Sequence, residues 1–228
     1  MVPHSPQGRW LIGPLVLRVC DWLVPLGALA LAFVIGEAVA LHHPPALDGH
    51  LLDWVAAHIS GGLQDSLVTV YRLTGKAFTP VLVLISMLYL MRQRRWRDLA
   101  LLVTSCGGIL VLVDVLLKPH FDRLRPPDSL IPLEGRSFPS GHAAGSVAFY
   151  MAMVVILSVD HPRRRWPLTL AAVAWMALIW LSTLVVRAHW PSDLLAGGAV
   201  GLAWLWLCLA GWRRLPGPPA ADRSSPSD

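Results

Sequence analysis

The stretch LALLVTSCGGILVLVDVLL, residues 99–117, decides the fold class of this chain. Its only charged side chain is Asp114. A bilayer core about 30 Å thick requires roughly 20 apolar residues in one helix, so this stretch predicts a transmembrane helix. Further apolar runs predict an all-α polytopic membrane protein, a six-transmembrane-helix bundle. These runs are Val19–Leu41, Ala77–Met91, Ala143–Val159, Pro167–Val186 and Leu194–Trp212.

The composition agrees with a membrane protein and excludes an ordinary soluble domain. Of the 228 residues, 55% are hydrophobic and 14% are charged, whereas soluble domains carry about a quarter charged residues. The net charge of +5 is not taken as a sign of nucleic-acid binding, because the arginines cluster at the ends of apolar runs. We expect one membrane domain over residues 19–212, a cytoplasmic segment over 1–18 and a disordered cytoplasmic tail over 213–228.

Arginine placement predicts which loops face the cytoplasm. Arginines cluster within 92–97, 163–165 and 213–214, and the positive-inside rule assigns these segments to the cytoplasmic side. Both termini are then cytoplasmic, and the remaining loops lie on the opposite face. The run 77–91 is the shortest and contains Pro80, so it must extend back to Leu73 to cross the bilayer. The segment 47–70 is expected to include a short amphipathic helix on the outer face.

The first polar segment on that face is KPHFDRLRP, residues 118–126. Lys118 and Arg125 supply positive charge, and the planar fork of arginine can grip two phosphate oxygens. Pro119 and Pro126 favour a stiff, non-helical path. The pattern also fits a basic loop that anchors to lipid headgroups, and the segment alone does not decide between these functions.

The second polar segment is PSGH, residues 139–142, at the start of an apolar run. Ser140 is expected to be the helix N-cap. The free N–H groups of Gly141 and His142 would then point at an anion, and His142 becomes a candidate general acid. The alternative is a capped helix start whose histidine meets interfacial water.

In the third polar segment, His189 and Asp193 are four residues apart and can face each other. The carboxylate would keep one imidazole nitrogen protonated, which leaves the other as a nucleophile that forms a phosphohistidine. In the alternative, Asp193 is the N-cap of the last helix and His189 a bystander. Both roles can hold together.

The three segments together resemble the type 2 phosphatidic acid phosphatase superfamily, in its bacterial six-span membrane branch. The family's first motif, Lys, six residues, Arg-Pro, is matched by Lys118 to Pro126, and its second, Pro-Ser-Gly-His, by 139–142. The resemblance covers about residues 50–212. It implies that His189 is the nucleophile, Asp193 its orienting partner and His142 the general acid. It also implies a phosphate site without a metal or other cofactor, formed by Lys118, Arg125, Ser140 and Gly141.

The third motif departs from the family pattern, which is Ser-Arg, five residues, His, three residues, Asp. Ser182 holds the serine place, but Thr183 stands where the family has arginine. Arg187 follows four residues later, and on a helix these two positions share a face. We therefore expect Arg187 to reach the phosphate from there. The competing interpretation is a dead or altered site.

The resemblance implies hydrolysis of a lipid phosphomonoester or diphosphate at the outer face of a bacterial plasma membrane. Undecaprenyl diphosphate is the first choice, because family members on this face recycle it. Phosphatidylglycerol phosphate, phosphatidic acid and lipid A phosphates follow. The alternative class is a non-catalytic lipid-phosphate binder or transporter, although binding alone requires neither His142 nor His189. A vanadate-dependent peroxidase shares such a constellation, but the membrane character argues against it.

Overall fold

The structure is a computed structural model that describes residues 12–40 and 45–215. These residues form helices and loops and contain no strand. The helices are α1 Ile12–Ala40, α2 Ala46–His58, α3 Gly61–Arg72, α4 Phe78–Arg92, α5 Trp96–Leu110, α6 Lys118–Phe121, α7 Gly141–Ser158, α8 Arg165–Val185 and α9 Pro191–Arg214. The all-α prediction is confirmed. Of the tail expected over 213–228, Arg213 and Arg214 belong to α9, so that boundary is wrong, and the residues from 216 onward lie outside the described residues.

Five helical stretches in the described part of the chain are long and apolar enough to cross a bilayer. They are α1, α5 with its continuation through α6, α7, α8 and α9. A sixth crossing is possible only if α3 and α4 act as one span, bent by 45° around Gly75. Among the predicted spans, this one has the shortest apolar run in the sequence. A short clean run explains why such a crossing would need two helices joined at a bend.

The exterior of the bundle is apolar, as expected of a surface in lipid. Large side chains such as Trp22, Phe33, Leu84 and Leu170 are more than half exposed. Apolar patches of this extent are unusual on soluble monomers and mark surfaces that contact another apolar phase. The helices themselves satisfy the backbone hydrogen bonds that the hydrocarbon core cannot.

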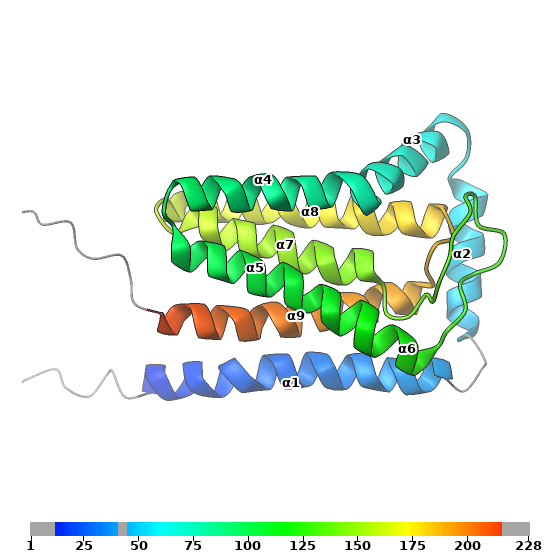
Figure 1. Cartoon of the computed structure of the whole chain (residues 1–228). Coiled ribbons are helices and arrows are strands. Elements are labelled where there is room, and N and C mark those ends of the chain that lie inside the picture. Colours follow the sequence, from blue (N-terminus) through cyan, green and yellow to red (C-terminus); the bar gives the residue numbers. More distant parts are fainter. Residues whose placement is uncertain (1–11, 41–44, 216–228) are drawn as a thin grey trace, which may run out of the picture.

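The two ends of the bundle differ in character (Figure 1). The α4–α5 and α7–α8 turns, which hold arginine clusters, lie at one end together with the start of α1 and the end of α9. The long loop after α6, the α8–α9 turn and α2 lie at the other end. Helix α2 crosses this end and contacts α8 and α9. The arginine-rich turns and the polar segments therefore lie at opposite ends of the bundle, as the arginine placement predicted.

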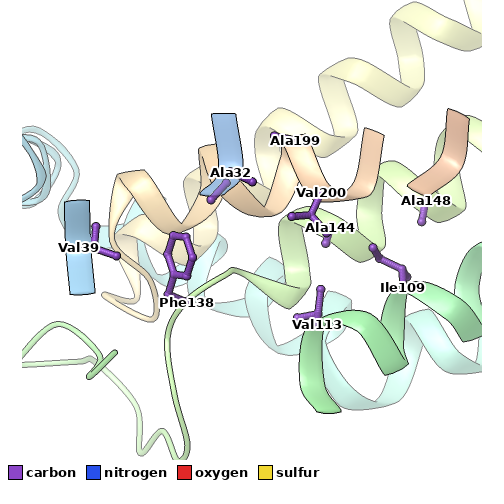
Figure 2. Packing of buried hydrophobic residues seen from close by; sticks show 10 residues of the cluster. Ala32, Val39, Ile109, Val113, Phe138, Ala144, Ala148, Ala199 and Val200 are labelled. Atoms are coloured by element: carbon purple, nitrogen blue, oxygen red, sulfur yellow. The ribbon is translucent and has the colours of Figure 1, made fainter. Parts of the chain in front are cut away.

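The main core cluster connects the bundle to the loop that precedes α7. Figure 2 shows Phe138 next to Ala32 and Val39 of α1. Its side chain is 1% exposed and packs edge-on against Phe121 at the end of α6. Burial of an aromatic ring of this size contributes about 2–3 kcal/mol. Phe138 therefore anchors the loop immediately before Ser140.

Glycines in α9 allow that helix to approach α7 closely. A side chain at Gly197 would collide with the main-chain carbonyl oxygen of Ser140. At Gly201, the added carbon would lie 2.6 Å from the carbonyl oxygen of Ala144. Because the obstructing atoms belong to the backbone, the contact cannot be relieved by turning a side chain.

Gly197→Ala is expected to destabilise the protein by about 1–3 kcal/mol, because the two helices must separate to admit the methyl group. The measurement is the thermal unfolding midpoint of the purified chain in detergent. Gly211→Ala is the matched control, since a side chain there meets nothing within 4 Å. Equal midpoints for the two variants would contradict the close contact.

Candidate active site

The three polar segments meet at one end of the bundle, although they are far apart in the sequence (Figure 1). The amide of Ser140, before α7, donates to the carbonyl oxygen of Asp193 in α9 at 3.0 Å. The amide of Leu130, in the long loop, donates to the carbonyl oxygen of Val186 at 3.1 Å. These backbone contacts fix the loop against the α8–α9 turn.

His189 lies in the α8–α9 turn and is 2% exposed. Its Nδ1 is 2.8 Å from the carbonyl oxygen of Ser137, which can only accept a hydrogen bond. The proton therefore sits on Nδ1, and Nε2 keeps its lone pair. Asp193 is the more distant partner, with Oδ2 at 3.6 Å from Nδ1. The prediction from the sequence gave this orienting role to Asp193 alone and did not include the main-chain carbonyl oxygen of Ser137.

Burial lowers the pKa of the His189 imidazole from its ordinary value near 6.5. Asp193 acts in the opposite direction, whereas the positive charges of Arg125 and Lys118 lower this pKa further. A lowered pKa keeps the imidazole neutral at neutral pH and into mildly acidic solution. Neutrality is the condition for Nε2 to act as a nucleophile.

His142 occupies the first turn of α7, and its ring centroid is 6.1 Å from that of His189. The ring stacks on Tyr71 of α3 at 4.8 Å between centroids. Its Nε2 is buried and has no hydrogen-bond partner among the described residues. Buried nitrogens are seldom left unpaired unless they serve a ligand or a reaction. The free nitrogen fits a group that exchanges a proton with a bound molecule.

Two cations adjoin the imidazoles. Lys118 pairs with Asp114 at 2.5 Å, as the spacing of four residues predicted. Arg125 donates from Nη1 to the carbonyl oxygen of Ala188 at 2.6 Å and from Nε to that of Glu134 at 3.1 Å. These bonds use two of its five N–H donors. Both side chains are thereby positioned while donors remain for an anion.

The first turn of α7 adds backbone donors. Ser140 is the N-cap, and its Oγ accepts from the amide of Ala143 at 3.3 Å, as expected. The amides of Gly141 and His142 precede the first intrahelical donor, so the helix itself does not use them. Lys118 Nζ lies 3.7 Å from the point where a side chain on Gly141 would begin. The absence of that side chain leaves room for an anion between them.

A pocket of about 520 Å³ opens beside the two cations. Its wall holds three carboxylates, Asp114, Asp122 and Glu134, and three cations, Lys118, Arg125 and Arg136. The two histidines do not line it. Lys118 and Arg125 link the two regions, because both line the pocket and the charges of both act on His189.

One expectation about backbone path is wrong, and so is one alternative about a helix cap. Residues 118–121 form α6, which continues α5, so the first motif begins on a helix despite Pro119. Pro119 follows the π-helical stretch Val111–Leu117, where the amide of Lys118 donates to the carbonyl oxygen of Val113, so the regular hydrogen-bond ladder is already altered where the proline occurs. Asp193 is not the N-cap of α9. It is the third residue of that helix, and its Oδ2 accepts from the amide of the N-cap residue Trp190 at 2.9 Å.

The expectation for Arg187 rested on a helix that the structure does not continue that far. Helix α8 ends at Val185, and Arg187 has a positive φ of 58°. Its Nη2 pairs with Asp53 of α2 at 2.6 Å. Thr183 is fully buried, and its hydroxyl donates to the carbonyl oxygen of Trp180. Arg187 is thus committed to α2, and the residues brought together are His142, His189, Asp193, Lys118, Arg125, Ser140 and Gly141.

Arg123 is a residue whose environment the sequence did not reveal. A loop arginine is usually solvated, but this one is 8% exposed. Its Nη1 pairs with Asp193 Oδ1 at 2.6 Å, and its Nη2 pairs with Asp48 Oδ2 at 2.8 Å. The only sequence signal was its position two residues before Arg125 in the first motif.

Comparison with known proteins places this arrangement in a family. The family model described as the PAP2 superfamily matches residues 98–215, which hold all three polar segments. The chain belongs to the PAP2 superfamily. Lipid A 1-phosphatases from Rhizobium johnstonii and Rhizobium etli are each 32% identical over 139 residues. These alignments cover 53% of this chain and 53% and 56% of the relatives.

Two further similarities extend the comparison. A lipid A 4'-phosphatase from Bacteroides thetaiotaomicron is 28% identical over 139 residues, covering 54% of this chain and 59% of the relative. The chain thus spans little more than half the length of these curated relatives. The crystal structure of a transmembrane PAP2 type phosphatidylglycerolphosphate phosphatase from Bacillus subtilis aligns with a TM-score of 0.74 at 21% identity. The alignment covers 85% of this chain and 98% of the Bacillus subtilis chain. The two proteins therefore share the same fold.

Proposed function

We propose that this multi-pass membrane protein is a lipid phosphatase that works through a phosphohistidine on His189. One observation carries the proposal. The buried His189 has its Nδ1 held by a carbonyl oxygen, the imidazole of His142 with its unpartnered Nε2 lies 6.1 Å from it between ring centroids, and the charges of two cations act on it. The family membership supports it, since the relatives named above are phosphatases of lipids.

The first chemical step would be an in-line displacement at phosphorus. Nε2 of His189 donates its lone pair to phosphorus, and the bond from phosphorus to the lipid oxygen breaks. His142, protonated when the anionic phosphate of the substrate is bound beside it, gives its proton to that oxygen as it leaves. Nδ1 of His189 keeps its proton throughout, so the phosphorylated ring carries the positive charge.

The second step would return the enzyme to its starting state. A water molecule attacks phosphorus and transfers a proton to His142, while the bond between phosphorus and Nε2 breaks. Inorganic phosphate leaves, and both imidazoles regain their initial protonation. Lys118, Arg125, Ser140 and the amides of Gly141 and His142 would hold the phosphate oxygens in both steps. Neither step uses a metal ion.

The fold favours a site at the outer face of the bacterial plasma membrane. The arginine clusters lie at the opposite end of the bundle (Figure 1), which the positive-inside rule assigns to the cytoplasm. A lipid would enter from the bilayer with its tail between helices and its phosphate beside Lys118 and Arg125. The 520 Å³ pocket would receive the polar part of the headgroup.

The substrate is proposed as a lipid phosphomonoester or diphosphate. Undecaprenyl diphosphate is the first choice from the sequence. Because three relatives are named as lipid A phosphatases, lipid A phosphates become an equally strong candidate substrate. A pocket wall with three carboxylates and three cations offers acceptors and donors to a hydroxyl-rich headgroup. Undecaprenyl diphosphate, phosphatidylglycerol phosphate and phosphatidic acid have smaller headgroups than lipid A, which would leave more of this wall uncovered.

The test is phosphate release by the purified chain from a panel of these four lipid phosphates, with EDTA present. We expect turnover of at least one, with higher kcat/KM for lipid A phosphate than for phosphatidic acid. Lipid binding without phosphate release would favour the alternative of a binder or transporter on the same scaffold. Loss of activity in EDTA would contradict a metal-free mechanism.

A further inference from the structure

A buried cluster of charge beside the proposed site joins three elements of the chain. The guanidinium of Arg123 bridges two carboxylates, with Nη1 at 2.6 Å from Asp193 and Nη2 at 2.8 Å from Asp48. Nη1 also donates to the hydroxyl of Ser192 at 2.8 Å. The three charged side chains are at most 7% exposed. A buried charge is costly without partners, so such complete pairing indicates a built arrangement.

Asp48 connects this cluster to α2, the helix that crosses the end of the bundle (Figure 1). Its Oδ1 accepts from the amide of Ser192 at 2.9 Å, and its Oδ2 accepts from the Ser192 hydroxyl at 2.5 Å. The first turn of α9 is thereby tied to α2. Only an arginine can span both carboxylates, because its fork presents two separate nitrogen atoms.

The charges of this cluster do not cancel. With both carboxylates ionised, Asp48, Arg123 and Asp193 carry a net charge of −1. This charge faces His189, whose Nδ1 lies 3.6 Å from Asp193. If Asp48 were absent, Arg123 would neutralise Asp193 completely. Asp48 therefore controls how strongly the negative charge of the cluster acts on the imidazole of His189.

We propose that Arg123 and Asp48 are positioning residues for the reaction at His189. Arg123 holds the carboxylate of Asp193 in place, and Asp48 offsets the charge of Arg123, so that Asp193 stabilises the positive ring formed on phosphorylation. This inference rests on the proposed function for its role in catalysis. Its electrostatic part can be measured without a substrate.

The other charged and titratable groups that face His189 are Lys118, Arg125 and His142. They come from α6, the long loop and α7. None of them bonds to Asp48 or Arg123 in the hydrogen bonds and ion pairs of the described residues. Changes confined to the cluster therefore alter one source of potential at His189 and leave these three in place.

The test is a charge cycle of three variants, Asp48→Asn, Arg123→Gln and the double variant. Arg123→Gln leaves two carboxylates near His189 and should raise the pKa of His189 by about one unit. Asp48→Asn removes a negative charge and should lower it. The double variant restores the original net charge and should return the pKa towards the wild-type value.

The readout is a pH titration of the full chain in detergent, with isotope-labelled histidines followed by NMR. The His189 signal is identified by its absence in His189→Gln. In the lipid phosphatase assay, the acidic limb of kcat/KM should move in the same order, because activity requires neutral His189 and is lost as pH falls through its pKa. In the single variants, kcat should fall about 10- to 100-fold.

Asp98→Asn is the matched control, because Asp98 is a buried acid paired with Arg95 at 2.6 Å at the other end of the bundle. It should leave the His189 pKa unchanged. If Arg123 and Asp48 only stabilised the fold, all three cluster variants would be less stable with no ordered change in this pKa. That result, or a double variant shifted further than either single one, would overturn the inference. Absent phosphatase activity with the ordered pKa shifts intact would overturn the proposed function and retain the electrostatic part.

Discussion

Replacing His189 with glutamine is expected to lower kcat for phosphate release by at least about 10³-fold, because no other group can form the covalent intermediate. Glutamine retains a polar side chain that can still hydrogen-bond near the Ser137 carbonyl oxygen, which accepts from His189 Nδ1 at 2.8 Å. Substrate binding should change much less than kcat. The measurement is steady-state release from the best substrate of the panel, which gives kcat and KM separately.

The matched control is His161→Gln, since His161 is exposed between α7 and α8 at the opposite end of the bundle. It should retain wild-type kcat and unfold at the same temperature. Residual activity of His189→Gln within tenfold of the wild type would remove His189 from the nucleophile's role. A fall in both variants would indicate damage from the substitution itself.

Arg125→Ala should show the second-largest effect, a loss of about 10²- to 10³-fold in kcat/KM. Arg125 is held by the carbonyl oxygens of Ala188 and Glu134, and its positive charge acts on His189. With arginine missing at Thr183, Arg125 and Lys118 are the cations beside the imidazoles. Removing one of them leaves the phosphate under-neutralised in the transition state.

Arg187→Ala is the informative comparison, because Arg187 pairs with Asp53 on α2. We expect it to retain activity within about threefold, since an exposed ion pair of this kind contributes little. Comparable losses in Arg125→Ala and Arg187→Ala would show that Arg187 turns towards the phosphate when a lipid is bound. The arginine expected from the family pattern would then have been replaced after all.

The fold was predictable because apolar length is a local property of the sequence. The stretch 99–117 lies within one continuous helical path through α5 and α6, and the other long runs also became helices. The boundaries were less predictable. Residues 118–121 are helical despite Pro119, and the short run 77–91 is long enough to cross only if it is joined to α3 through the bend at Gly75. The length of an apolar run predicts neither how a helix packs against its neighbours nor where it bends.

The candidate site was predictable where one segment contains the whole interaction. Ser140 caps α7, and Asp114 pairs with Lys118, both within four residues. Interactions between distant segments were not accessible. The contact of Ser137 with His189 spans 52 residues, and the contact of Arg123 with Asp48 spans 75. The helical placement of Arg187 was wrong, because a helical spacing was applied two residues beyond the end of α8, and its role at the phosphate stays a prediction.

The covalent role of His189 can be tested most directly by the stereochemical course at phosphorus. A lipid phosphorothioate made chiral with oxygen isotopes is hydrolysed in isotopically labelled water, and the configuration of the thiophosphate product is determined. Two successive in-line displacements, at Nε2 and then by water, predict overall retention of configuration. Inversion would show that water attacks the lipid phosphate directly, and it would contradict the phosphohistidine mechanism.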